Sequence, residues 1–318
     1  MNRTRRNIWI DCDPGIDDAA AIALAAAHPG ELRIVGISSV AGNQTIETTT
    51  ANALKLCEIL GLEGVPVVKG AQGPLLREPY IVPGIHGEDG LGDCGMQSEG
   101  RKKISADGIK GIYEGIMSLP EGEKLTLVAT GPFTNVALLL RAFPEVKSKI
   151  EQIVFMGGGT FGNVSAMAEF NVWEDPEAAS IMFREGLPMV MCGLDVTDFC
   201  YIGSQEIDAL LTASEGSVQR MYGRMFDFYR HAPSYLENGA PHIHDAVCIA
   251  YLLHPEYFHG SEIYVEVDCS ENTNRGMTIC DRRNVCAKKA NILMLERADS
   301  AAFLALLLEA LRWHDGRR

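Results

Sequence analysis

Several features that would assign a protein to a class are missing from this sequence. No apolar run reaches the roughly 18 residues that cross a bilayer, so we expect no membrane contact. The apolar stretch after the basic residues 1–6 is short and ends in Asp11, so we expect no signal peptide. Positive charge is scarce: 28 Lys and Arg stand against 42 Asp and Glu. The net charge of −14 argues against a nucleic-acid partner, which needs basic patches.

The nine cysteines form no Cys-x-x-Cys pair, which argues against a structural zinc site. Their number is odd and no export signal is visible, so reduced thiols and a cytoplasmic location fit best. We find no repeat, low-complexity tract or linker, and 47% of the residues are hydrophobic, as in ordinary globular proteins. We therefore expect a single domain over residues 1–318.

The most informative feature that is present is a group of four aspartates, Asp11, Asp13, Asp17 and Asp18, between an apolar run and an alanine-rich stretch. The pattern predicts a buried strand, a Pro-Gly turn and the start of a helix, which brings Asp13 close to Asp17 and Asp18. Capping of the helix accounts for one or two of these carboxylates. Because like charges this close repel one another, a hard cation held by oxygen ligands explains the group better.

Strand patterns alternate with helix patterns through the first two-thirds of the chain. This alternation predicts an α/β fold with a mainly parallel sheet flanked by helices, in which ligands bind beyond the carboxyl ends of the strands. After the first strand, the predicted strands are 32–40, 65–68, 125–129, 150–156 and 188–192, and the predicted helices are 45–60, 133–143 and 176–185.

The remaining segments have a different character. The long loop 70–104 is rich in Gly and Pro, and loops of this length are usually functional. Residues 204–254 read as a helical segment. Residues 263–268 and 277–292 read as later strands that form a small antiparallel addition, and 300–313 as a final helix.

Polar residues follow almost every predicted strand. Each has a simple structural alternative, as a cap, a turn or an ordinary loop residue. Together, however, they project to one edge of the sheet, and Asn, Glu and Asp without basic neighbours suit a neutral polyhydroxyl ligand such as a sugar. These residues are Asn43, Thr130, Asn163, Glu169, Asn171, His244 and Asp245.

These motifs, taken in order, resemble the inosine-uridine preferring nucleoside hydrolases over nearly the whole chain. The acidic segment 11–19 looks like the N-terminal signature of that family, and it is highly specific. The similarity continues through Gly42-Asn43, His86-Gly87, residues 130–135, residues 156–159, residues 168–171, residues 175–179 and His244-Asp245.

The resemblance implies a Rossmann-like fold of the nucleoside hydrolase type and hydrolysis of the N-glycosidic bond of ribonucleosides to ribose and free base. It implies one Ca²⁺, held by Asp13, Asp18, Asp245 and the carbonyl of Thr130. Asp17 would be the general base on water, and His244 the acid at the leaving base. The implied substrate contacts are Asn43, His86, Met156, Asn163, Glu169, Asn171 and Asp245.

The resemblance also implies a homodimer or homotetramer. The segment 222–241, with Tyr229, Arg230, His231 and Tyr235, would shape the base pocket, but it cannot be matched to the family residue by residue. The preference for purines or pyrimidines is therefore left open, although residues 239–241 mildly favour a pyrimidine-preferring member.

Two other functions compete with this interpretation. A haloacid-dehalogenase-like phosphatase also begins with Asp-x-Asp after an apolar strand and uses a divalent ion. That family has Thr or Val two positions after the second aspartate, where this chain has Gly15. A non-catalytic sugar-binding protein of the periplasmic type would share the α/β alternation but would carry an export signal.

Overall fold

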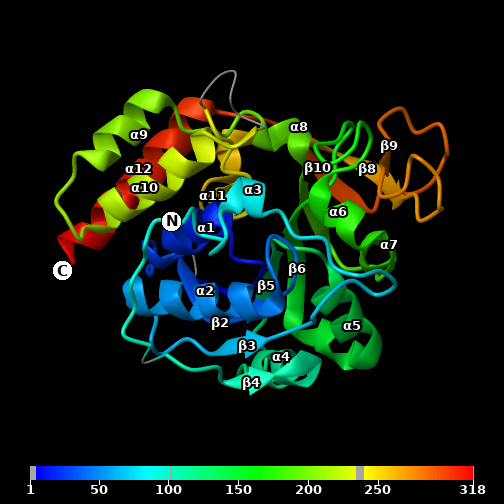
Figure 1. Cartoon of the computed structure of the whole chain (residues 1–318). Coiled ribbons are helices and arrows are strands. Elements are labelled where there is room, and N and C mark those ends of the chain that lie inside the picture. Colours follow the sequence, from blue (N-terminus) through cyan, green and yellow to red (C-terminus); the bar gives the residue numbers. More distant parts are fainter. Residues whose placement is uncertain (1–4, 101, 234–239, 318) are drawn as a thin grey trace.

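The computed structural model describes residues 5–100, 102–233 and 240–317. Within them, one sheet of ten strands has the order β4-β3-β2-β1-β5-β6-β7-β10-β8-β9 (Figure 1). The strands are β1 (Arg6–Cys12), β2 (Leu32–Ser39), β3 (Val67–Lys69), β4 (Ala106–Asp107), β5 (Leu125–Ala129), β6 (Ile150–Met156), β7 (Met189–Cys192), β8 (Phe258–Val267), β9 (Thr278–Asp281) and β10 (Ile292–Ala298).

The strands from β4 to β7 pair in parallel, and β10 adds in parallel to β7. Strands β8 and β9 then pair antiparallel at this edge, so the prediction of a mainly parallel sheet with an antiparallel addition is confirmed. From β1 the chain builds outward through β2, β3 and β4 on one side, and from β5 through β6 and β7 on the other. This reversal of strand order opens a crevice at the carboxyl ends of β1 and β5, where doubly wound sheets bind ligands.

Helices cover both faces of the sheet. Alternate residues of β1 point to opposite faces, so Ile8 and Ile10 join one apolar core and Trp9 the other. The first core holds α1 (Ile16–Ala26), α2 (Ile46–Ile59), α10 (Val218–Arg230), α11 (Ala246–Leu253) and α12 (Ser300–Gly316), and the second holds α4 (Gly108–Met117), α5 (Thr134–Ala142) and α7 (Pro176–Phe183). The shorter helices are α3 (Pro83–His86), α6 (Phe170–Glu174), α8 (Leu194–Thr197) and α9 (Ser204–Leu211).

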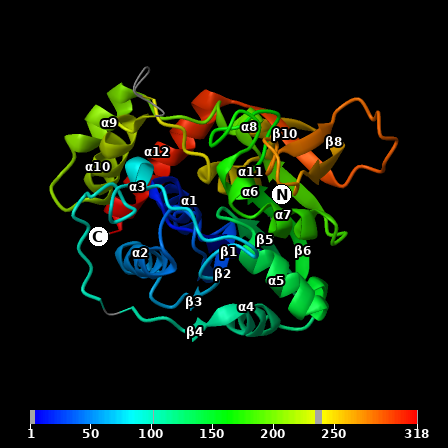
Figure 2. The same cartoon turned by 45° about the vertical axis from the view of Figure 1, so that its right-hand side comes forward.

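Helix α1 is buried along its whole length. Figure 2 shows it between the sheet and the layer formed by α10 and α12. Its six small alanines within residues 16–26 explain this position, because they let neighbouring elements approach closely from every side. The helix that begins beside the acidic motif is thus held rigidly by the core.

Most of the predicted elements are confirmed within one to three residues at each end, and Thr45 caps α2 as expected. The predicted strand 277–292 is wrong as one element, because only Thr278–Asp281 is a strand before β10 begins at Ile292. Between them the chain turns: the Asp281 carboxylate accepts hydrogen bonds from the amides of Val285 and Cys286, and Asn284 has a positive φ of 52°. Helix α4 was not predicted, although Ile109, Ile112 and Ile116 carry a helical spacing.

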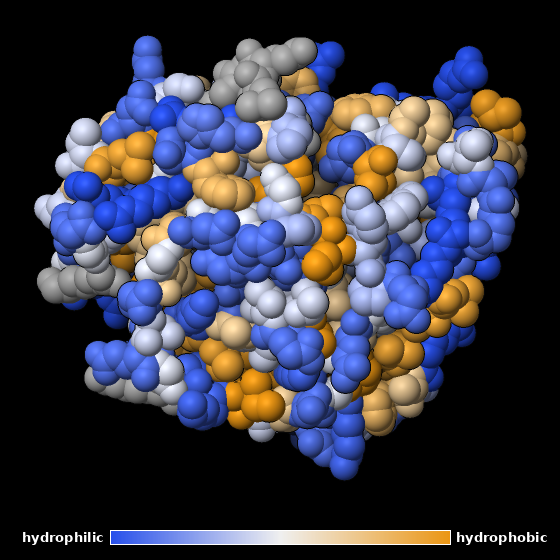
Figure 3. Space-filling model, viewed as in Figure 1, coloured by the Kyte–Doolittle hydropathy of each residue, from blue (hydrophilic) through white to orange (hydrophobic). Residues whose placement is uncertain are grey.

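The described part of the chain contains no helix that is both long and apolar enough to cross a membrane. Figure 3 shows polar and apolar residues interspersed over one face of the molecule.

Candidate active site

A cavity of about 290 Å³ lies at the carboxyl ends of the central strands. It is bordered by the start of α1, by α3, α6 and α8, and by the start of α11, which gather in the upper centre of Figure 1. All the predicted site residues line this cavity except Asp13 and Asp18, which lie buried beneath it. The lining residues among them are Asp17, Asn43, His86, Thr130, Met156, Asn163, Glu169, Asn171, His244 and Asp245.

Three buried carboxylates meet at the floor of the cavity. Asp17, Asp18 and Asp245 each place one carboxylate oxygen within 4.8 Å of the other two. Asp17 and Asp18 come from the first turn of α1, and Asp245 is the N-cap residue of α11. Burial, followed by the charge of Asp18, raises the pKa of Asp17 to about 8. Without a cation, these carboxylates are therefore driven to hold protons.

The donor set fits a hard cation. Oδ1 of Asp13 and Oδ1 of Asp17 are buried and have no hydrogen-bond partner within the described residues. Buried oxygens without partners are costly, and a cation that binds oxygen would satisfy the one on Asp13. Carboxylates and the nearby carbonyl of Thr130 are ligands that Ca²⁺ accepts.

The carboxylates are also held in place from the backbone. Oδ2 of Asp13 accepts a hydrogen bond of 2.7 Å from the amide of Asn43, and Oδ2 of Asp18 accepts one of 3.0 Å from the amide of Gly15. A Cβ atom on Gly131 would come within 2.6 Å of Oδ1 of Asp13. The sequence therefore needs glycine at position 131 for β5 to approach the acidic motif this closely.

The opposite wall consists of amide and carboxylate groups from α6. Asn171 donates from Nδ2 to the carbonyl oxygens of Thr130 (2.8 Å) and Met156 (3.2 Å), which joins α6 to the ends of β5 and β6. Glu169 is the N-cap residue of α6 and accepts from the amides of Gly158, Asn171 and Val172. Burial raises the pKa of Glu169 to about 7 despite these bonds. Glu169 thus caps α6, one of the structural alternatives considered from the sequence, and it also faces the cavity.

Two buried histidines lie on the remaining wall. The amide of Ile16 donates to Nδ1 of His86 over 3.2 Å, so this ring carries its proton on Nε2. Nδ1 of His244 lies 2.8 Å from Oγ1 of Thr197. Burial lowers the pKa of both imidazoles to about 3, and for His244 the neighbouring histidines act in the same direction. Both rings are therefore neutral near pH 7 in this form of the protein.

Sequence reasoning missed a second polar group at the cavity, the pair formed by Asp198 and His242. Nδ1 of His242 lies 3.5 Å from Oδ1 of Asp198, and the His242 and His244 rings are 5.5 Å apart. Burial raises the pKa of Asp198 and lowers that of His242, and each partner opposes the shift of the other. His242 stood two residues before a recognised motif, but nothing in the sequence connected it with Asp198.

The described part of the segment 222–241 contributes one of its predicted residues to the cavity wall. Tyr229 lines the cavity, with its ring centroid 5.4 Å from that of His86, whereas Arg230 and His231 do not line it. Tyr235 lies outside the described residues. Other lining residues, none of which was predicted as a site residue, are Val82, Ile85, Phe161, Val164, Phe170 and Leu194.

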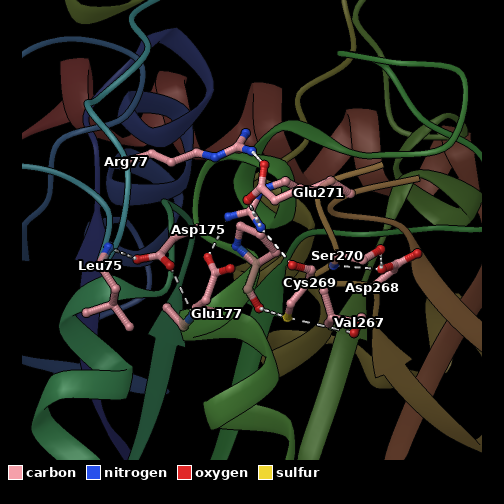
Figure 4. A network of polar contacts seen from close by, with 12 residues as sticks. Leu75, Arg77, Asp175, Glu177, Val267, Asp268, Cys269, Ser270 and Glu271 are labelled. Carbon is pink, nitrogen blue, oxygen red and sulfur yellow. Dashed lines mark hydrogen bonds and ion pairs between the residues drawn. The ribbon is translucent and has the colours of Figure 1, made fainter. Parts of the chain in front are cut away.

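A network of polar contacts anchors the long loop ahead of α3 (Figure 4). The amide of Leu75 donates to Oδ2 of Asp175 over 2.9 Å, and Arg77 forms an ion pair with Glu271 in the loop between β8 and β9. Within the loop 70–104, which we predict to be functional, α3 brings Ile85 and His86 to the cavity.

Comparison with known proteins supplies independent information. Residues 8–305 match the family model described as inosine-uridine preferring nucleoside hydrolase. The chain is 39% identical over 310 residues to the pyrimidine-specific ribonucleoside hydrolase RihA of Shewanella sp. (strain MR-7), with 96% of each chain covered. It is 38% identical over 314 residues to the pyrimidine-specific ribonucleoside hydrolase RihB of Escherichia coli (strain K12 / DH10B), with 97% of each covered.

Solved structures agree with the sequence matches. A purine-preferring ribonucleoside hydrolase from Gardnerella vaginalis superposes with a TM-score of 0.88 at 31% identity, covering 98% of this chain and 100% of that one. The plant nucleoside hydrolase PpNRh1 gives a TM-score of 0.88 at 29% identity, covering 97% and 99%. The predicted fold class is confirmed by these structures.

Proposed function

Since this chain belongs to the inosine-uridine preferring nucleoside hydrolase family and is a ribonucleoside hydrolase, we propose that it cleaves pyrimidine ribonucleosides to ribose and the free base. The choice of pyrimidines rests on the two relatives at 38% and 39% identity, which are named pyrimidine-specific. The observation that carries the mechanism is the group formed by Asp17, Asp18 and Asp245 at the floor of the cavity.

The proposed cofactor is one Ca²⁺, held by Asp13, Asp18, Asp245 and the carbonyl of Thr130. When bound, it would lower the pKa of water and orient the sugar hydroxyls. The unpartnered oxygen of Asp13 and the all-oxygen donor set support this assignment.

Asp17 is proposed as the base that takes the proton from the attacking water. Asp17 lines the cavity and has an unpartnered Oδ1, whereas Asp13 lies beneath the cavity. A carboxylate that reaches the cavity can accept a proton from a molecule bound there. The two aspartates are distinguished by experiment: D13N should lose the metal, and D17N should keep it but lose activity.

His244 is proposed as the acid that protonates the departing base. Its neutral state in the substrate-free protein means that it must gain a proton when substrate is bound. Negative charge that develops on the leaving base raises the pKa of an adjacent imidazole, so protonation and departure support each other. His86 would contact the base from the α3 side of the cavity.

The ribose would bind between the acidic floor and the wall formed by α6. Cleavage of the glycosidic bond builds positive charge on the sugar, and carboxylate and amide oxygens around it stabilise that charge. The proposed contacts are Asn43, Met156, Asn163, Glu169, Asn171 and Asp245.

The direct test is a panel of ribonucleosides assayed for free ribose. We expect uridine and cytidine to be cleaved faster than inosine, and D17N to release no ribose above background. Failure of every nucleoside would contradict the proposal. In that case, hydrolysis of p-nitrophenyl phosphate with Mg²⁺ would indicate a phosphatase, and calorimetric binding of ribose without turnover a sugar-binding protein.

We propose that the chain is a single domain and that it forms a homodimer or homotetramer in the cytoplasm. The free thiols of all nine cysteines are compatible with a reducing compartment.

A further inference from the structure

We propose that Asp198, held by His242, recognises the polar edge of the nucleobase by accepting a hydrogen bond from it. The matching donors are N3–H of uracil and the exocyclic amino group of cytosine. This inference rests on the proposed function, because it assigns the base end of the same cavity.

The carboxylates that line the cavity differ in their surroundings. Among the described residues, four carboxylates line the cavity: Asp17, Glu169, Asp198 and Asp245. Asp17 and Asp245 belong to the acidic group at the floor, and the oxygens of Glu169 cap α6. Among the described residues that line the cavity, Asp198 is thus the carboxylate that belongs neither to the acidic floor nor to the α6 cap.

Asp198 is the C-cap residue of α8. The segment after α8 runs beside the segment before α11: the amide of Ile243 donates to the carbonyl of Cys200, and Tyr201 and His242 form an antiparallel bridge. Along such an extended segment, alternate side chains share a side. His242 and His244 therefore both line the cavity, while Ile243 between them is fully buried in the core. Asp198 consequently stands at the leaving-base end, near the proposed acid.

Proteins recognise bases through an aspartate carboxylate that accepts a hydrogen bond from an N–H on the edge of the base. The side chain of Asp198 is 44% exposed, so it can reach a ligand, and that of His242 is 22% exposed. The contact of 3.5 Å from Nδ1 of His242 limits the directions in which the Asp198 carboxylate can turn. His242 is thus a positioning residue, and Asp198 makes the contact.

The test compares substrates that differ only at this edge. Uridine and cytidine carry the donor, whereas the riboside of 2-pyridone lacks it and is no larger. We expect D198A to lower kcat/KM for uridine and cytidine by about 10- to 100-fold, the effect of one hydrogen bond to a charged group. Cleavage of the pyridone riboside should change less than about 2-fold. Equal loss on all three substrates, or no loss on uridine and cytidine, would overturn the proposal.

Two further variants separate positioning from folding. H242A should show a smaller loss than D198A on uridine, and the double variant should lose no more than D198A, because His242 acts only through Asp198. Additive losses would contradict this dependence. Glu256 and His254 form a similar pair, 2.9 Å apart and outside the cavity, so E256A is a matched control that should resemble the wild type on every substrate.

A binding measurement makes the result independent of turnover. Calorimetric titration with cytosine should give weaker binding to D198A than to the wild type, and 2-pyridone should bind both equally. If the wild type hydrolyses no nucleoside, the proposed function fails and this titration still decides the role of Asp198. Equal binding of cytosine to both proteins would show that Asp198 does not read the base.

Discussion

The hydroxyl of Thr130 donates a hydrogen bond of 2.7 Å to Oδ1 of Asp18. Thr130 follows β5, and Asp18 lies in the first turn of α1, so this bond crosses the point at which the strand order reverses. The other oxygen of Asp18 accepts from the amide of Gly15. Asp18 therefore has a defined direction before any ion binds, and a site prepared in this way loses less entropy when it is filled.

Replacement of Thr130 by valine should weaken the binding of Ca²⁺. T130V removes the hydroxyl but keeps the shape of the side chain and the carbonyl that is the proposed ligand. We expect a loss of affinity of about 10-fold or more, because one hydrogen bond to a charged group is removed. Titration of metal-free protein against a fluorescent calcium chelator measures it. T130S keeps the hydroxyl and should resemble the wild type, and wild-type affinity in T130V would show that the bond does not prepare the site.

Removal of the 2′-hydroxyl of the substrate should be costly. A site built to bind a hydroxyl leaves polar groups unpaired when it is missing, and such sites discriminate by roughly 10⁴-fold. We expect kcat/KM for uridine to exceed that for 2′-deoxyuridine by a factor of this order. Comparable values for the two substrates would contradict a ribose site at Asn43, Glu169 and Asn171.

The role of His244 can be separated from that of Asp17 by the choice of leaving group. H244A should cleave uridine about 10² to 10⁴ times more slowly, the usual effect of losing a general acid. It should stay near wild type on p-nitrophenyl riboside, whose phenolate leaves without a proton, whereas D17N should be slow on both. If H244A is equally impaired on the activated substrate, His244 is not the acid, and His86 becomes the next candidate.

Neutralisation of Glu177 should destabilise the fold more than neutralisation of Glu271. Both carboxylates pair with Arg275, whose side chain is only 5% exposed, but Glu177 is 19% and Glu271 73% exposed. E177Q removes the charged partner of the largely buried Arg275 guanidinium. We therefore expect the free energy of unfolding to fall by about 2 kcal/mol, which is less than the loss for a fully buried pair. E271Q should change it by less than about 0.5 kcal/mol. Urea denaturation measures both, and equal effects would contradict this reading of the network.

The stability of the protein should depend on pH through His86. Burial lowers the pKa of His86 to about 3 in the folded state, below the ordinary value of 6.5 that the unfolded chain retains. The unfolded state therefore binds one more proton between pH 6.5 and pH 3, and this favours unfolding as the pH falls through that range. As the pH falls, the free energy of unfolding of the wild type should decrease more steeply than that of H86Q. The two slopes should differ by up to about 1.4 kcal/mol per pH unit. Urea denaturation from pH 6 to pH 4 measures both slopes. Equal slopes for the wild type and H86Q would contradict a buried neutral His86.

Local patterns in the sequence determined the elements and the positions of polar residues along them. The apolar runs at 125–129 and 150–156 became β5 and β6 with the predicted bounds, and the acidic motif lies at the start of α1 as expected. Such features depend on the alternation of apolar residues and on turn and cap residues within a few positions, so a single sequence shows them. The break at Asn284 was missed because its turn depends on a positive φ that the strand pattern did not reveal.

Only the tertiary structure decided which of these residues meet. Asp245 reaches Asp17 because α11 begins beside the start of α1 in the same core. Asp198 and His242 meet because the segments that follow α8 and precede α11 run side by side. The order of strands and the packing of helices on them set these contacts between distant parts of the chain, and no local periodicity records that order. The aspartates at the start of α1 were therefore visible in the sequence as a group, whereas their meeting with Asp245 and the pair formed by Asp198 and His242 became visible only in the fold.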